Sequence, residues 1–137
     1  MRIEVAQSLA AVPAADWNSL RGSQCPFLRH EFLLALEETG CVGGASGWYP
    51  CHLLLRDDTR RLVGAMPLYR KTSSHGEFVF DWSWADAYRR AGLRYFPKLV
   101  SAVPFTPAFR DYMVAASCTR SPVRRSRSAL AISVISW

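Results

Sequence analysis

Three side chains between residues 75 and 86 have the chemistry needed for acid–base catalysis. They are His75, Asp81 and Asp86. An imidazole can take a proton from an amine near neutral pH, and the deprotonated amine can then attack an acyl carbonyl. A histidine beside a glycine in a polar loop is also typical of a solvated surface. The residues alone therefore leave both interpretations open.

Aromatic side chains accompany these candidates. The group consists of Trp82, Trp84, Tyr88, Tyr95 and Phe96. Such rings can wall a ligand pocket, although more often they supply ordinary core area. The pattern favours the core interpretation and keeps the pocket as the alternative.

Other motifs that could carry chemistry are incomplete. His30-Glu31 begins like a zinc-protease HExxH motif, but Leu34 stands where the second ligand is needed. The glycines between residues 40 and 47 follow a helical pattern and lead into a strand, the reverse of a dinucleotide-binding turn. The four cysteines form no CxxC pair, so we expect free thiols and no metal site.

The charge is concentrated near the C-terminus. The chain has 137 residues and a net charge of +6, of which residues 109–137 carry +4 and residues 1–108 only +2. No apolar run approaches the roughly 20 residues of a membrane-spanning helix, and we expect no export signal. These features predict a near-neutral, cytoplasmic domain over residues 1–108. Residues 109–137 are predicted to be an Arg/Ser-rich, disordered tail.

The hydrophobic pattern predicts a mixed α/β (α+β) fold with an antiparallel hairpin. Strands are expected at 2–6, 51–56, 61–70, 77–82 and 98–103, and helices at 14–20, 26–39 and 84–91. The hairpin joins residues 51–56 to 61–70 through the turn at 57–60. Glycines 40 and 92 are predicted to end two of the helices.

Several long motifs occur in one order along residues 3–108. They are PFLRHEFL at 26–33, the loop at 43–48, LVGAMPLY at 62–69, HGEFVFDWSWADAY at 75–88, YFPKL at 95–99 and VPFTPA at 103–108. Together these resemble the N-terminal part of the bacterial FemAB-like N-acyltransferases, a branch of the GNAT-like acyl-CoA N-acyltransferase superfamily. The resemblance implies a partial GNAT-like fold and transfer of an acyl group to an amine. The donor would be acyl-CoA, as a co-substrate rather than a permanently bound cofactor, or an aminoacyl-tRNA.

The same resemblance suggests which residues form the site. His75 and Asp81 are the candidate catalytic residues, because either could take the proton from the amine. The candidate substrate-binding residues are Trp82, Trp84, Asp86, Tyr88, Phe105 and Thr106. The acceptor would be a small-molecule amine or a peptidoglycan precursor.

The resemblance to the FemAB-like family ends abruptly after Ala108. Family members are several hundred residues long, so we expect this chain to be an N-terminal fragment that a frame shift or truncation has made inactive alone. Division of a sheet would leave an unpaired edge, through which the chain could self-associate. The alternative is a non-enzymatic binding module whose basic tail contacts nucleic acid. The Arg/Ser-rich part of the tail at 117–128 contains no aromatic residue on which single-stranded bases could stack, so nucleic acid is the less favoured partner.

Overall fold

The computed structural model describes residues 1–77, 81–105 and 114–115. This part of the chain contains both strands and helices in a mixed α/β arrangement, which confirms the predicted fold class. The strands are β1 (Arg2–Ala6), β2 (Trp48–Pro50), β3 (His52–Arg56), β4 (Leu62–Met66), β5 (Tyr69–Lys71), β6 (Lys98–Val100) and β7 (Val114–Ala115). The α-helices are α1 (Ala14–Asn18), α2 (His30–Glu38) and α3 (Trp82–Arg90). Short 3-10 helices span Leu9–Ala11, Pro26–Leu28 and Gly44–Ser46.

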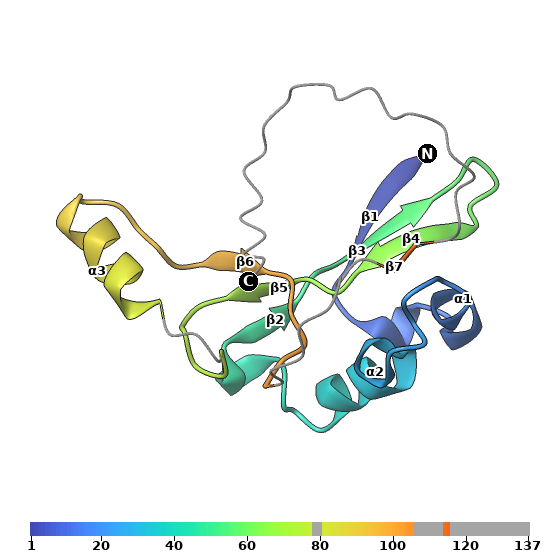
Figure 1. Cartoon of the computed structure of the whole chain (residues 1–137), viewed down its shortest axis with the longest axis horizontal. Coiled ribbons are helices and arrows are strands. Elements are labelled where there is room, and N and C mark those ends of the chain that lie inside the picture. Colours follow the sequence, from blue (N-terminus) through green and yellow to red (C-terminus); the bar gives the residue numbers. More distant parts are fainter. Residues whose placement is uncertain (78–80, 106–113, 116–137) are drawn as a thin grey trace.

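The strands form two antiparallel sheets (Figure 1). The first has the order β1-β3-β4-β7, and the second has the order β2-β5-β6. Two short connections join strands of different sheets directly. Cys51 lies between β2 and β3, and the pair Pro67-Leu68 lies between β4 and β5.

The predicted hairpin is present, but its second strand is divided. Asp57 shapes the turn, because its Oδ1 accepts hydrogen bonds from the backbone N–H groups of Thr59 and Arg61, both at 2.9 Å. The sequence predicted one continuous strand over residues 61–70, whereas the structure ends β4 at Met66 and starts β5 at Tyr69. Pro67 has no N–H to donate to a ladder, and the chain changes sheet at this point.

The main core lies between α1, α2 and one face of the first sheet. Trp17, Leu33, Leu54 and Ala65 meet there, each at most 4% exposed. The indole N–H of Trp17 donates to the carbonyl of Leu28 at 2.8 Å, so its one polar group is satisfied. The helices thus cover a single face of this sheet.

A buried Glu–His pair connects α2 to β3. The Nε2 of His52 lies 3.0 Å from Oε1 of Glu37, while Nδ1 accepts the backbone N–H of Leu68 at 3.2 Å. Because Nδ1 is an acceptor, the proton of the neutral ring lies on Nε2 and is donated to Glu37. Glu37 also accepts the N–H of Leu9 at 3.1 Å. One carboxylate therefore fixes the relative positions of a strand, a helix and the segment after β1.

The third helix stands apart from both cores. The sequence predicted a strand over residues 77–82 and a helix from Trp84 to Ala91, whereas α3 already begins at Trp82. Residues 78–80 of the predicted strand lie outside the described residues. Gly92 follows α3 with a φ of +72°, consistent with its predicted role at the helix end. No residue of α3 is buried, and the helix lies at one end of the molecule (Figure 1).

Candidate functional site

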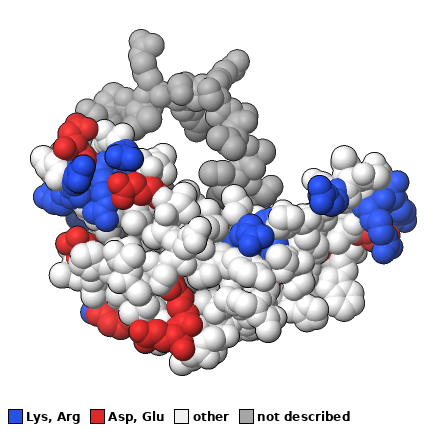
Figure 2. All heavy atoms as spheres, turned by 180° about the vertical axis from the view of Figure 1, so that it is seen from behind, with Lys and Arg blue, Asp and Glu red and all other residues white. Residues whose placement is uncertain are grey.

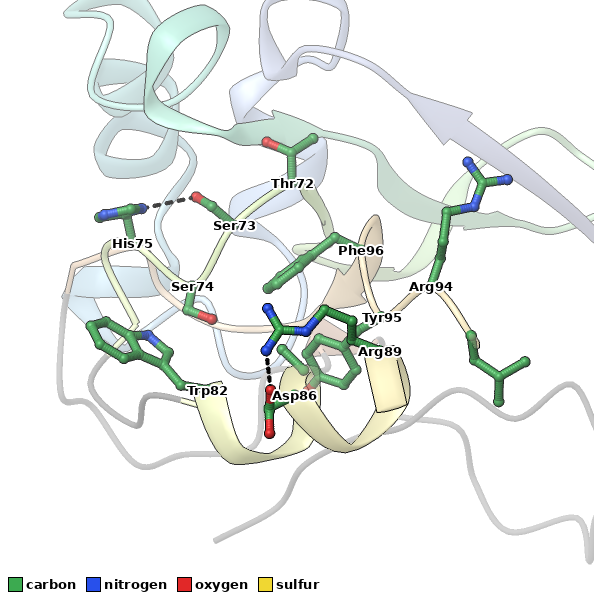
Figure 3. A pocket seen from close by; sticks show the side chains of 12 residues that line it. Thr72, Ser73, Ser74, His75, Trp82, Asp86, Arg89, Arg94, Tyr95 and Phe96 are labelled. Carbon is green, nitrogen blue, oxygen red and sulfur yellow. Dashed lines mark hydrogen bonds and ion pairs between the residues drawn. The ribbon is translucent and has the colours of Figure 1, made fainter. Parts of the chain in front are cut away.

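An open pocket of about 750 Å³ lies beside α3. Its walls are the loop of residues 72–75 that follows β5, one side of α3, and the segment 93–96 that leads to β6. Figure 3 shows the loop on one side of the pocket and α3 on the other. The lining residues are Thr72, Ser73, Ser74, His75, Trp82, Ala85, Asp86, Arg89, Leu93, Arg94, Tyr95 and Phe96.

A buried cluster of charges holds these three walls together. The carboxylate of Asp81, the residue before α3, accepts hydrogen bonds from Ser74, from Lys98 and from the hydroxyl of Tyr95. Lys98 also contacts Glu77 Oε2 at 2.7 Å. Asp81 is only 7% exposed, so its charge is compensated by these partners rather than by water. The cluster links the loop, the start of α3 and β6.

The cluster shifts the pKa values of its members. Burial would raise the pKa of Asp81, but the hydrogen bonds from Lys98, Ser74 and Tyr95 outweigh it and hold this pKa below its usual value. Burial likewise raises the pKa of Glu77, and here Lys98 does not compensate fully. Among the described residues, the Oε1 of Glu77 is buried without a hydrogen-bond partner. The hydrogen bonds to Asp81 thus favour the ionised form of this candidate catalytic residue and join it to three elements of the pocket.

A second buried lysine fixes the backbone of His75. The Nζ of Lys71 donates to the His75 carbonyl at 2.5 Å, and the indole N–H of Trp48 donates to the same oxygen at 3.1 Å. Lys71 is completely buried, and its Nζ lies 4.0 Å from the centre of the Trp48 ring. Burial lowers the pKa of Lys71 to about 8.

Gly76 allows the loop to pack closely. Its φ is +79°, and a Cβ at this position would lie 2.4 Å from the Phe105 ring and 2.8 Å from Nε1 of Trp48. Only glycine fits such a backbone and such a space without a shift of the neighbours. The backbone at 75–76 is thus fixed by hydrogen bonds from Lys71 and Trp48 to the His75 carbonyl, and by the close packing of Phe105 on Gly76.

The side chain of His75, by contrast, is exposed and lines the pocket. Its Nδ1 lies 3.2 Å from the hydroxyl of Ser73, as Figure 3 shows. This arrangement leaves Nε2 available to an incoming group. A fixed backbone with an exposed imidazole is suited to proton transfer at the pocket surface.

Arginines give the outer part of the pocket a positive character. Arg89 and Arg90, in the last turn of α3, both pair with Asp86. Arg94 also lines the pocket. Figure 2 shows Lys and Arg side chains gathered at the end of the molecule that α3 forms. This end can therefore attract an anionic group.

The structure brings together only some of the predicted substrate-binding residues. Trp82 and Asp86 line the pocket, whereas Trp84 and Tyr88 do not. Tyr88 packs instead on Tyr95, with ring centres 5.1 Å apart. Phe105 lies outside the pocket lining, against Trp48, with ring centres 5.8 Å apart. Thr106 is outside the described residues.

The sequence interpretation missed the residues that support the pocket. Lys71, Glu77 and Lys98 were not proposed, although each carries a charge into the protein interior. Lys71 and Lys98 lie in short strands opposite one another, as the register of β5 and β6 shows. Lys71 follows Arg70 at the end of β5 and Lys98 is the first residue of β6, so neither position distinguishes a buried lysine from a solvated one in the sequence.

The described part of the chain has neither a candidate metal site nor a membrane-spanning helix. No group of three or more His, Cys, Asp or Glu side chains there could hold a metal ion. No helix among the same residues is long and apolar enough to cross a bilayer.

The described residues form a mixed α/β protein with a pocket that is lined in part by arginines. Residues 8–133 match the model of the FemAB-like family, which is described as peptidoglycan biosynthesis/recognition. The chain therefore belongs to the FemAB-like family, as the sequence motifs suggested. The matched range continues beyond Ala108, where the predicted tail begins. Neither the curated proteins nor the solved structures gave a match.

Proposed function

We propose that this chain takes part in N-acyl transfer to an amine of a peptidoglycan precursor, with the pocket beside α3 as the acceptor site. Membership of a family described as peptidoglycan biosynthesis/recognition supports the class of acceptor. The observation that carries the proposal is the position of His75. Its imidazole is exposed in the pocket, while its backbone is fixed by Lys71 and Trp48.

The proposed chemistry is direct transfer without a covalent enzyme intermediate. His75 accepts a proton from the acceptor ammonium, and the free amine attacks the carbonyl carbon of the donor. A C–N bond forms and the C–S bond of an acyl-CoA, or the C–O bond of an aminoacyl-tRNA, breaks. The leaving thiolate or alkoxide takes this proton from the imidazolium, and the regenerated imidazole removes the second proton from the acylated nitrogen and releases it to water. Acyl-CoA or aminoacyl-tRNA thus acts as a co-substrate, and the partial GNAT-like architecture is part of the same proposal.

The neighbouring residues have supporting roles in this proposal. Asp81 is a positioning residue, since its carboxylate holds Ser74 and Tyr95, which both line the pocket. Trp82 offers a flat apolar surface at the pocket, with 66% of the side chain exposed. Arg94 would attract a carboxylate or phosphate of the acceptor.

A second candidate is recognition of peptidoglycan without chemistry. The exposed Trp82 and Trp84 of α3 favour it, because large aromatic side chains are usually buried unless they contact a partner. The nucleic-acid alternative depends on residues 109–137, most of which lie outside the described residues, and it stays a prediction.

The experiment is a transfer assay on the full chain. A soluble stem peptide with a free side-chain amine is incubated with acetyl-CoA or with aminoacyl-tRNA, and mass spectrometry detects the acylated peptide. Binding of the stem peptide is measured separately by calorimetry. We expect His75→Asn to lose about 100-fold or more in transfer rate while peptide binding is retained.

Two tryptophan variants test the location of the site. Trp82→Ala should weaken peptide binding, whereas Trp84→Ala should not, because both side chains are 66% exposed but only Trp82 lines the pocket. Binding without transfer would favour the recognition function. Equal effects of the two variants would refute this pocket as the acceptor site.

A further inference from the structure

The strand β1 is an open edge of the first sheet. In the described part of the chain it pairs only with β3, and its other side faces no strand (Figure 1). Ile3 and Val5 point away from the helices and are 69% and 60% exposed. An edge with unpaired backbone groups and apolar side chains is a template for another strand.

The apolar side chains of β1 continue across the sheet. Ile3 is opposite Leu55 and Val5 is opposite Leu53 on β3, and Leu53 is in turn opposite Met66 on β4. Residues directly opposite in antiparallel strands lie on the same face. The face that α1 and α2 do not cover is therefore apolar from β1 to β4.

The charged residues of β1 lie on the other face and are arranged symmetrically about Ile3. Arg2 and Glu4 flank Ile3, and their side chains are 77% and 40% exposed. Glu4 pairs with Arg56 of β3 at 3.0 Å, so it lies beside a cation in the monomer as well. Each β1 strand thus carries one cation and one anion at equal distances from Ile3.

This symmetry selects one register for pairing with a second copy. If two β1 strands pair antiparallel about Arg2, two arginines face each other, and if they pair about Glu4, two glutamates do. Pairing about Ile3 places Ile3 opposite Ile3 and Arg2 of each copy opposite Glu4 of the other. Among these registers, which keep the apolar faces together, only the last pairs opposite charges.

We propose that the chain forms a two-fold symmetric dimer through antiparallel pairing of its β1 strands, centred on Ile3. The pairing joins the first sheet of each copy into one continuous sheet, and it brings their apolar faces together across the two-fold axis. It is an isologous interface, because the same residues of both copies meet. The proposal is independent of the acyl-transfer function, since neither residue of the charge pair lines the pocket. A strand of five residues gives a small interface, so we expect a dimer that dissociates on dilution.

Sedimentation equilibrium of the full chain between about 5 and 500 µM tests the dimer, a range that covers the weak association expected of a small interface. Arg2→Glu should raise the dimer Kd by about tenfold or more, because both charge pairs become repulsive. Within the monomer the substitution removes the 3.9 Å contact between Arg2 and Glu4, but it places the new carboxylate opposite Arg56 instead of a second arginine, so the thermal midpoint of unfolding should change little. Arg21→Glu makes the same charge change at an exposed position outside β1 and serves as the control.

The decisive test is complementation. Glu4→Arg alone should also weaken the homodimer, but an equimolar mixture of Arg2→Glu and Glu4→Arg chains should form a heterodimer, because both pairs then join opposite charges. The double variant should regain a homodimer by exchange of the charges. A wild-type chain that stays monomeric at the highest concentration overturns the proposal. So does a dimer that is insensitive to Arg2→Glu, since another surface would then hold it together.

Discussion

The ammonium of Lys98 in β6 contacts the carboxylate of Asp81, the residue immediately before α3. This contact joins a sheet to a helix that has no buried residue of its own. The same lysine binds Glu77 at 2.7 Å, so one cation compensates two carboxylates. The position of α3, and with it one wall of the pocket, therefore depends on a buried charge cluster more than on apolar packing.

Removal of this cation should destabilise the protein. We expect Lys98→Met to lower the free energy of unfolding by about 3 kcal/mol, since Asp81 and Glu77 would stay buried without their partner. Urea denaturation measures the change. The control is Arg61→Met, because the Arg61 side chain is 76% exposed and its pair with Asp57 should contribute little.

A second variant distinguishes loss of charge compensation from loss of packing. The double variant Lys98→Met/Asp81→Asn removes one of the two uncompensated charges and should recover part of the loss. If the double variant is less stable than Lys98→Met alone, the destabilisation has another origin.

The sequence predicted only part of the site, because the residues that line the pocket are close together in the chain and those that support it are not. Short-range features, such as His75 beside Gly76 and the aromatic group at 82–88, identified the segment that forms the pocket. The partners that fix this segment are distant in the chain: Lys98 lies 17 residues from Asp81, and Trp48 lies 27 residues from His75. Such pairs depend on strand register, which local patterns do not determine.

The fold, like the site, was predicted from the sequence where local signals define an element and was missed where distant pairing does. The strand at 2–6 and the hairpin turn at 57–60 are confirmed because local signals define them: alternation in one case and an Asp-centred turn in the other. The strand β2 was missed, since Trp48–Pro50 contains a proline and follows a glycine loop. It forms only because Lys71 and Tyr69 of β5 are available to pair with it. Tertiary pairing overrode the local preference there.

The close approach at Gly76 should make this position intolerant of any side chain. We expect Gly76→Ala to cost about 2–4 kcal/mol, from the positive φ and from overlap with Phe105 and Trp48. Gly92→Ala is the matched control, because Gly92 has a φ of +72° but no atom within 4 Å of the added Cβ. It should cost only about 1 kcal/mol. Equal losses would show that backbone strain alone explains the effect, contrary to the packing seen here.

The Glu37–His52 pair should make the free energy of unfolding depend on pH in the acidic range. Burial opposes ionisation of Glu37, but its hydrogen bonds, chiefly that from His52, outweigh burial and lower its pKa below 4.5. A carboxyl with a lowered folded pKa stabilises the protein above the unfolded pKa, and this contribution is lost as the pH falls through the folded pKa.

Glu37→Gln should therefore be less stable than the wild type by about 1–3 kcal/mol at pH 7, and the difference should shrink below about pH 4.5. Denaturant titrations of both proteins at a series of pH values measure it. A difference that stays constant down to the lowest pH at which both fold would contradict the role of the ionised carboxylate.

Lys71 should make stability rise with pH as well, but in the alkaline range. Burial lowers its pKa from 10.5 to about 8, so between these values the unfolded chain holds a proton that the folded protein has released. The contribution of Lys71 to stability should then rise with pH across this window, by at most about 1.4 kcal/mol per pH unit.

Lys71→Met lacks the titrating amine and is the reference. The stability of the wild type relative to this variant should increase from about pH 8 to about pH 10. A flat or falling difference would show that Lys71 is charged in the folded protein throughout, and that its bond to the His75 carbonyl is made by an ordinary ammonium.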